Sequence, residues 1–265
     1  MTSAKKSLKA QHVLNASQHL INLEHQGLSF KEIHNTIPKA NISVWSKAVE
    51  ALPGSKLIFA RKALSQVLPT AANLVRWKRS TDPSCHLCTS GNAQTNKHVL
   101  SNCSSPVALK RYTKRHDDVL LIIVIWLKSI LPNTYKLYAD LPDCNCFSLN
   151  DLFQNFRPDI AVLMNNIIII LELTVCHEIN LTKSKQYKVS KYSNISSSLT
   201  AAVTNCSVKV FTVEVSTLGF ISDISDFCKV CLLNKLPTSV KTSIVNAAVS
   251  NSYSIYCNRN NAVEN

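Results

Sequence analysis

Residues 157–175, with the sequence RPDIAVLMNNIIIILELTV, contain two runs of β-branched and aliphatic residues that are joined by Asn165 and Asn166. Runs of this composition are typical of strands, and two Asn residues suit a tight turn because Asn tolerates positive φ. The stretch therefore predicts a β-hairpin with strands at residues 157–164 and 167–175.

Two carboxylates occupy matching positions in this predicted hairpin. A two-residue turn pairs Met164 with Ile167, and the same register continues outward to pair Asp159 with Glu172. Directly opposed Cβ atoms lie ~5 Å apart, where two like charges destabilise a sheet. A Mg²⁺ ion between the carboxylates would relieve this repulsion, because Mg²⁺ prefers oxygen ligands. A salt bridge from Glu172 to Arg157 or to a Lys is the alternative, since a charge in so apolar a strand needs a partner, a proton or a metal.

Residues 182–204 predict a helix after the hairpin. Lys188 and Tyr192 stand at the start of its otherwise apolar stripe, so we expect Lys188 to lie near the sheet and Lys191 to lie close to the same face. Either Lys could position an attacking water or stabilise the charge that develops on a phosphate. The alternative is that both side chains extend to solvent.

Four possible metal ligands lie upstream with the spacing C-x2-C-x9-H-x4-C. Two Cys residues two positions apart can direct both sulfurs to one ion, and a later His and Cys can complete a tetrahedron, the arrangement that structural Zn²⁺ favours. The chain has ten Cys and no signal peptide, which indicates a reducing compartment. We expect the pairs Cys144/Cys146 and Cys228/Cys231 to be structural thiols, and we assign the zinc ligands to Cys85, Cys88, His98 and Cys103.

The positive charge is concentrated in the first part of the chain. The net charge is +13, and residues 1–115 contain 17 basic and four acidic residues, whereas residues 116–265 contain 12 of each. Such a basic region indicates a polyanion partner, nucleic acid first and an acidic membrane second, although a solubilising surface would have the same composition. His116 and Asp117 could contact DNA or order the interface with the zinc module. Asp117 could instead act as a cap or form a salt bridge with Arg115. The predicted nucleic-acid-binding residues are Arg76, Lys78, Arg79, Arg111, Lys114, Arg115 and His116.

The same composition argues against several other classes of protein. The longest apolar runs, residues 119–127 and 167–171, are shorter than the ~18–20 residues of a membrane span. With only four Gly, the chain has no phosphate-binding glycine loop, so we expect neither a membrane partner nor a small-molecule cofactor.

The pattern predicts an α/β protein with a helical basic N-terminal region. Further helices are expected within residues 1–80 and over 106–130 and 222–250, a loop over 131–150, and a third strand over 208–215. The expected domains are a helical linker region at 1–80, a CCHC zinc knuckle at 81–105, an α/β domain at 106–250 and a flexible tail at 251–265.

These features, in this order, resemble the C-terminal third of site-specific non-LTR retrotransposon polyproteins that carry a restriction-like endonuclease. The resemblance extends from about residue 52 to residue 219. The motifs that carry it are LPTAANLVRW at 68–77, the Cys/His spacing, Arg115-His116-Asp117, Arg157-Pro158-Asp159 with Glu172, the K-x2-K-Y pattern of Lys188, Lys191 and Tyr192, and EVSTLG at 214–219.

The resemblance implies a PD-(D/E)xK-like fold and a metal-dependent DNA endonuclease that nicks target DNA for target-primed reverse transcription. Asp159 and Glu172 would bind Mg²⁺ or Mn²⁺. Thr174 stands where many such enzymes carry the catalytic Lys, which favours Lys188 on the following helix. The residues assigned to catalysis are Asp159, Glu172, Lys188, Lys191 and Tyr192.

The partners implied are DNA and the RNA of the element, and the substrate implies the nucleus. We expect no reverse transcription from this chain alone, since residues 138–141, YADL, lack the second Asp of a polymerase box. Two alternatives remain open. One is a nucleic-acid-binding module with an inactive nuclease fold, and the other is a protein-interaction domain that uses the zinc module.

Overall fold

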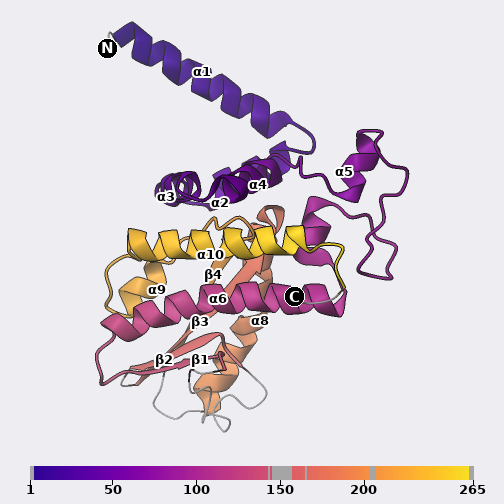
Figure 1. Cartoon of the computed structure of the whole chain (residues 1–265). Coiled ribbons are helices and arrows are strands. Elements are labelled where there is room, and N and C mark those ends of the chain that lie inside the picture. The colour runs from indigo at the N-terminus through magenta and orange to yellow at the C-terminus, as the bar shows by residue number, and fades with distance from the viewer. Residues whose placement is uncertain (1–2, 143, 145–156, 165, 203–206, 263–265) are drawn as a thin grey trace.

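The computed structural model describes residues 3–142, 144, 157–164, 166–202 and 207–262 (Figure 1). Its helices are α1 (Ser3–Asn22), α2 (Gly27–Thr36), α3 (Lys39–Glu50), α4 (Gly54–Leu64), α5 (Ala71–Arg76), the π-helix η1 (His98–Asn102), α6 (Pro106–Ile130), the 3-10 helix η2 (Glu178–Asn180), α8 (Leu181–Ala202), α9 (Ser225–Val230) and α10 (Thr238–Cys257). Its strands are β1 (Lys136–Ala139), β2 (Ile160–Met164), β3 (Ile167–Cys176) and β4 (Ser207–Ser216).

The predicted hairpin forms the centre of the sheet. Among the described residues the sheet has the order β1-β2-β3-β4, antiparallel from β1 to β3 and parallel between β3 and β4. Met164 pairs with Ile167 and Ile160 with Leu171, so the predicted register is confirmed. Helix α8 makes the crossover that a parallel pair requires. The structure is therefore mixed α/β, as predicted.

The two faces of β3 have different chemistry. Leu171 and Leu173 belong to the apolar core that the sheet forms with α6 and α10, whereas Glu172 faces the side that α8 covers. Figure 1 shows α6 and α10 side by side over the sheet, with α8 beyond it. Because strand residues alternate between faces, one strand can supply both a core and a polar site.

Some boundaries differ from the predictions. Strand β2 begins at Ile160 instead of residue 157, since Pro158 has no N–H for the ladder. The expected loop at 131–150 contains the short strand β1, and the expected helix at 222–250 is two helices, α9 and α10. Helix α6, by contrast, has the predicted bounds, because Ser105 caps it by accepting a hydrogen bond from the Ala108 N–H and Pro106 occupies its first turn.

The predicted division into linker, knuckle and α/β domain does not correspond to separate cores. Ile33, Phe59 and Leu68 of the N-terminal region pack in one apolar cluster with Leu100 of the knuckle and Val249 of α10. The predicted tail at 251–265 is also wrong in its first part, since α10 continues to Cys257. Cys228 and Cys231 are each 1% exposed in the core, which confirms that they are structural; Cys146 lies outside the described residues.

No helix in the described part of the chain is long and apolar enough to cross a membrane.

Candidate functional site

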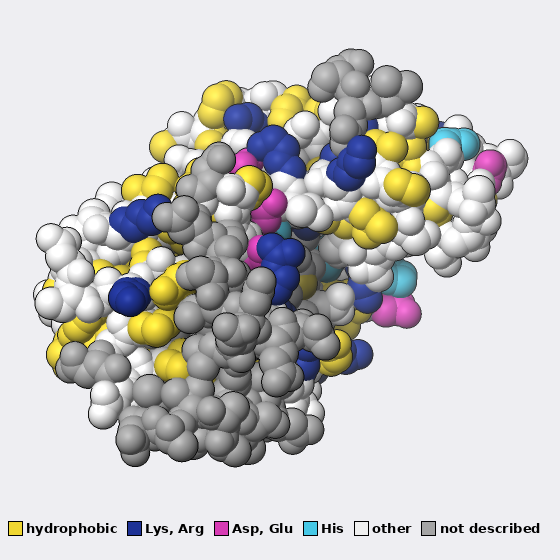
Figure 2. All heavy atoms as spheres, turned by 90° about the horizontal axis from the view of Figure 1, so that it is seen from below, with side chains coloured by type: hydrophobic (Ala, Val, Ile, Leu, Met, Phe, Trp, Pro, Cys, Tyr) yellow, Lys and Arg dark blue, Asp and Glu magenta, His cyan; other side chains and the backbone are white. Residues whose placement is uncertain are grey.

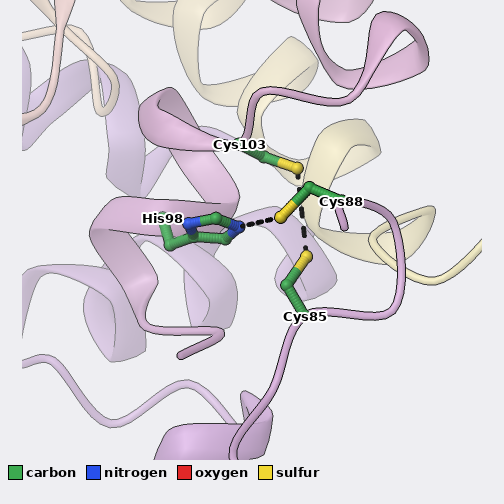
Figure 3. A group of neighbouring side chains, drawn as sticks. All are labelled: Cys85, Cys88, His98 and Cys103. Carbon is green, nitrogen blue, oxygen red and sulfur yellow. Dashed lines mark hydrogen bonds between the residues drawn. The ribbon is translucent and has the colours of Figure 1, made fainter. Parts of the chain in front are cut away.

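The four predicted zinc ligands converge on one point (Figure 3). Their ligand atoms all lie within 4.8 Å of one another. Cys85 Sγ and Cys103 Sγ are 3.9 Å apart, and Cys88 Sγ and His98 Nε2 are 3.5 Å apart. A tetrahedral Zn²⁺ with ordinary bond lengths would separate two sulfurs by about 3.8 Å and a sulfur from a nitrogen by about 3.6 Å. The donor set therefore fits zinc in both chemistry and size.

Local structure brings the four ligands together. An antiparallel bridge between Ser84 and Ala93 closes the loop that contains Cys85, whose N–H donates to Asn92 O. Gly91, at a φ of 66°, makes the turn inside this loop. The π-helix η1 then separates the last two ligands, and local π turns of this kind are frequent at functional sites.

The protonation of the ligands suits a metal. Burial lowers the pKa of His98, so the ring is neutral at pH 7 and can offer a lone pair. A hydrogen bond with the Ser90 hydroxyl lowers the pKa of Cys88 to about 7. Burial raises the pKa of Cys85, a cost that a bound cation would offset.

Tyr112 on α6 supports this centre and was not predicted from the sequence. Its hydroxyl accepts a hydrogen bond from the Cys103 N–H at 3.2 Å and lies 2.8 Å from Val99 O, to which it can donate. Tyr112 therefore fixes the last ligand and the π-helix onto α6. Its position nine residues after Cys103, on the first turns of a predicted helix, is the only signal in the sequence.

A second polar cluster lies at the open end of the hairpin. The Asp159 N–H donates to Glu172 Oε1 at 3.2 Å, and the Leu173 N–H donates to Asp159 Oδ2 at 2.7 Å. The side chain of Glu172 is 1% exposed and that of Asp159 is 14% exposed. The two carboxylates are thus directly adjacent, as the register predicts, and one of them reaches solvent.

Helix α8 brings two of the predicted catalytic residues to these carboxylates. Lys188 Nζ lies 2.7 Å from Glu172 Oε2 and 3.8 Å from Asp159 Oδ2. The Tyr192 hydroxyl donates to the same Glu172 oxygen at 2.7 Å. Lys191 is exposed, with Nζ 5.2 Å from the centroid of the Tyr192 ring. Lys188 and Tyr192 therefore belong to the cluster, whereas Lys191 lies at its edge.

His116 of α6 completes the cluster from the other side. We predicted it as a nucleic-acid contact, but its Nε2 lies 3.6 Å from Asp159 Oδ1 and its Nδ1 lies 3.1 Å from Asp117 Oδ1. Asp117 therefore pairs with His116 and not with Arg115. The Arg-His-Asp motif marked these residues in the sequence, but nothing in it indicated that α6 passes the open end of the hairpin.

Burial and neighbouring charges shift the pKa values of the titratable groups in this cluster. Burial opposes the charged form of His116, but its contacts with Asp159 and then Asp117 outweigh burial and raise its pKa to about 9. Burial and the adjacent Asp159 raise the pKa of Glu172, and Lys188 and Tyr192 oppose that rise. Burial would also raise the pKa of Asp159, yet His116 and Lys188 hold it below its usual value. His116 and Lys188 are therefore the cationic partners of the carboxylates in this cluster.

Comparison with known proteins bears on the zinc centre. Residues 28–109 match the family model of a zinc-binding domain in reverse transcriptase. The match supports a retrotransposon-related origin and, together with the Cys₃His geometry, zinc binding. It extends well beyond the expected knuckle at 81–105 and includes α2 to α5, in agreement with the shared core. A search of curated proteins gives no match.

Apart from His116, the predicted nucleic-acid contacts lie in three different environments. Arg76, Lys78, Arg79 and Lys114 are exposed, the last in an ion pair with Asp118 at 2.7 Å.

Arg111 uses its guanidinium to donate to Asn258 O at 2.7 Å and Asn261 O at 3.0 Å, so it holds the segment after α10.

The prediction of Arg115 as a nucleic-acid contact is wrong. It is 1% exposed, donates to Ser252 Oγ at 3.0 Å and lies over the Tyr112 ring, so it cannot contact DNA in this structure. Burial lowers its pKa to about 10, which leaves it charged at pH 7. Its role is to join α6 to α10.

Proposed function

We propose that the chain is a retrotransposon-derived, metal-dependent endodeoxyribonuclease that nicks DNA by phosphodiester hydrolysis, and whose site of action is the nucleus. The observation that carries the proposal is the convergence of four side chains on one partly exposed point: Asp159 just before β2, Glu172 of β3, and Lys188 and Tyr192 of α8. An acidic pair with a Lys beside it is a chemically suitable centre for phosphate-ester hydrolysis.

The two carboxylates fit a hard divalent cation. Their oxygens are the ligands that Mg²⁺ and Mn²⁺ prefer, and the partial exposure of Asp159 gives an ion access. Asp159 and Glu172 would hold the ion, which when bound supplies positive charge at the phosphate and lowers the pKa of a water.

The neighbouring residues would have separate tasks. Lys188 would donate to a phosphate oxygen as charge develops on it, and Tyr192 would hold Glu172 in orientation. Lys191, exposed at the edge, would contact the DNA backbone. On the face shown in Figure 2, Lys and Arg side chains lie beside a small group of Asp and Glu side chains near the middle of the molecule, which suits a phosphate backbone.

One observation favours a second candidate, a nucleic-acid-binding module without catalysis. Lys188 and His116 already lie beside Glu172 and Asp159, so both carboxylates have a cationic partner other than a metal. In that case the zinc-binding domain and the exposed cations would bind nucleic acid, and the carboxylates would only stabilise the fold.

Nicking of supercoiled plasmid by the zinc-loaded chain distinguishes the two candidates. We expect cleavage that requires added Mg²⁺ or Mn²⁺. Asp159→Asn and Glu172→Gln should each reduce the rate of this cleavage at least ~100-fold. Asp226→Asn is the matched control, because this carboxylate lies in an exposed ion pair with Lys229. Salt-sensitive DNA binding with no nicking would reject the nuclease in favour of the binding module. Nicking that persists in Asp159→Asn would show that the cluster is not the active site.

A further inference from the structure

A cavity of about 410 Å³ lies between the end of α2, the first turns of α8, strand β4 and the segment that follows β4. Two carboxylates, Glu214 and Asp223, line it together with side-chain amides and hydroxyls. Lys185 is the one cation among the described residues that line it. The cavity shares no lining residue with the carboxylate cluster or the zinc centre, so it is a separate site.

Glu214 is buried in this region without compensation. It is 2% exposed, and it pairs in the β3–β4 ladder with Thr174, which lies on the same face of β3 as Glu172. Among the described residues, neither Glu214 Oε1 nor Thr174 Oγ1 has a hydrogen-bond partner. A buried carboxylate needs a cation, a proton or hydrogen bonds, and the neighbouring strand supplies none of these.

The position of Glu214 is fixed by its backbone. Its N–H donates to Ser222 Oγ at 2.9 Å, and its carbonyl accepts from the Ser222 N–H at 2.9 Å. Of its two carboxylate oxygens, Oε1 is the one that is fully buried, so a ligand in the cavity would meet Oε2. Glu214 also begins the EVSTLG stretch at 214–219, to which the proposed nuclease assigns no task.

Asp223 supplies a second negative charge to the cavity. The N–H and the hydroxyl of Ser225 donate to its two oxygens, each at 2.9 Å. Burial would raise the pKa of Asp223, but these hydrogen bonds and the charges of Lys229 and Lys241 lower it, so Asp223 is charged at neutral pH. Both lysines bond to other side chains. The cavity can therefore accommodate a ligand with more than one positive charge.

The chemistry of the lining favours an alkylammonium over other cations. Among the described residues, only the zinc ligands form a group of three or more possible metal ligands. A guanidinium pairs best with both oxygens of a carboxylate, whereas Glu214 presents only one to the cavity. A primary ammonium is a compact charge for which one oxygen is sufficient. The volume falls within the ~300–1,000 Å³ of typical small-molecule sites, so the ligand can be longer than a single ammonium group.

We propose that this cavity binds a linear polyamine, with one primary ammonium on Glu214 Oε2 and a second ammonium attracted by Asp223. The side-chain oxygens of Thr182 and Gln186 on α8 would accept hydrogen bonds from its other N–H groups. Lys185 would compete with this ligand, because its flexible side chain carries the same ammonium group into the same cavity.

Calorimetric titration of the zinc-loaded full chain tests the proposal, in the absence of DNA, Mg²⁺ and Mn²⁺. The probes are spermidine, N-acetyl-lysine-amide and N-acetyl-arginine-amide, which present several ammonium groups, one ammonium and one guanidinium. We expect spermidine to bind on the order of tenfold more tightly than the lysine derivative, because only spermidine has a second ammonium for Asp223. The arginine derivative should bind no more tightly than the lysine derivative.

Three substitutions locate the binding in the cavity. Glu214→Gln should weaken spermidine at least ~10-fold, since it removes the charge that accepts from the ammonium. Lys185→Gln should strengthen spermidine on the order of threefold, because it removes the competing cation. Lys183→Gln is the matched control, since Lys183 is an exposed Lys on α8 outside the cavity and its loss changes the net charge equally.

Several results would overturn the proposal. Spermidine binding that Glu214→Gln leaves unchanged would place the ligand elsewhere. Equal effects of Lys185→Gln and Lys183→Gln would show that overall charge, and not the cavity, sets the affinity, and this comparison holds even if Glu214→Gln fails to fold. Equal affinity for spermidine and the lysine derivative would reject a polyamine in favour of the lysine side chain of a partner protein. Since no DNA is cleaved in this assay, its outcome is independent of the proposed nuclease.

Discussion

Lys188 is the cation that contacts the buried carboxylate of the cluster. Glu172 is buried beside another carboxylate, an arrangement that would be unstable without compensation. Thr174, two residues further along the strand, brings no charge, so the cation comes from α8 instead. A single Lys thereby connects the stability of the sheet to the chemistry that we propose for it.

This arrangement predicts an asymmetric result in a double-mutant cycle. Lys188→Met should destabilise the chain by about 3 kcal/mol, because it leaves Glu172 buried without its cation. Adding Glu172→Gln to Lys188→Met should recover a large part of that loss, since no uncompensated charge then remains. Urea unfolding of the zinc-loaded protein without added Mg²⁺ or Mn²⁺ measures both values. If the two single effects simply add, Lys188 does not compensate the charge of Glu172.

At the scale of elements, the sequence predicts what depends on near neighbours. The hairpin, its register and helix α6 follow from turn chemistry, alternation and a Ser-Pro start, all of which act within a few residues. The zinc ligands follow for the same reason, since their spacing lies within one short segment.

What the sequence does not predict depends on packing between distant elements. His116 joins Asp159 only because α6 crosses the open end of the hairpin. Arg115 has the composition of a surface residue, yet a helix more than a hundred residues away buries it. Strand β1 is short and pairs with β2 at the edge of the sheet, so its own residues give little signal.

We expect the packing of the N-terminal helices to depend on the zinc centre. Its residues Val99 and Leu100 belong to the same apolar cluster as the N-terminal helices, so loss of the metal should disturb more than one loop. We expect one zinc per chain, and a melting temperature that falls on the order of 10 °C after chelation or in Cys85→Ser, which corresponds to several kcal/mol.

Cys257→Ser is the control for this prediction, because Cys257 is exposed and lies outside the cluster. It should keep its zinc and its melting temperature. Metal analysis and thermal unfolding followed by circular dichroism provide the two readouts. Full zinc occupancy in Cys85→Ser would remove Cys85 from the set of ligands.

At the scale of the whole molecule, α10 connects regions that the sequence suggests are independent. The turn after β4 packs closely on it, since a Cβ at Gly219 would lie 2.8 Å from Val245 Cα. Ser252 accepts from Arg115 of α6 and donates to Thr217 O at 2.6 Å. The zinc-binding domain, the sheet and α6 therefore meet on one helix, and we expect them to unfold together.

A truncation after residue 250 tests this connection. The sequence predicts a flexible tail at residues 251–265, but in the structure this segment includes Ser252, the partner of buried Arg115, and Ile255, which is 4% exposed. Removing the acceptor of a buried cation costs about 3 kcal/mol, and loss of a buried Ile adds about 2 kcal/mol. Against a total stability of about 5–15 kcal/mol, the shortened chain should be largely unfolded or should melt far below the full chain in one transition.

Ser252→Ala, which removes only the hydroxyl, should lower the melting temperature less and keep the fold. A truncated chain with the same melting curve as the full chain would show that the part of α10 after residue 250 does not stabilise the fold. It would also show that Arg115 does not need Ser252 as its hydrogen-bond acceptor.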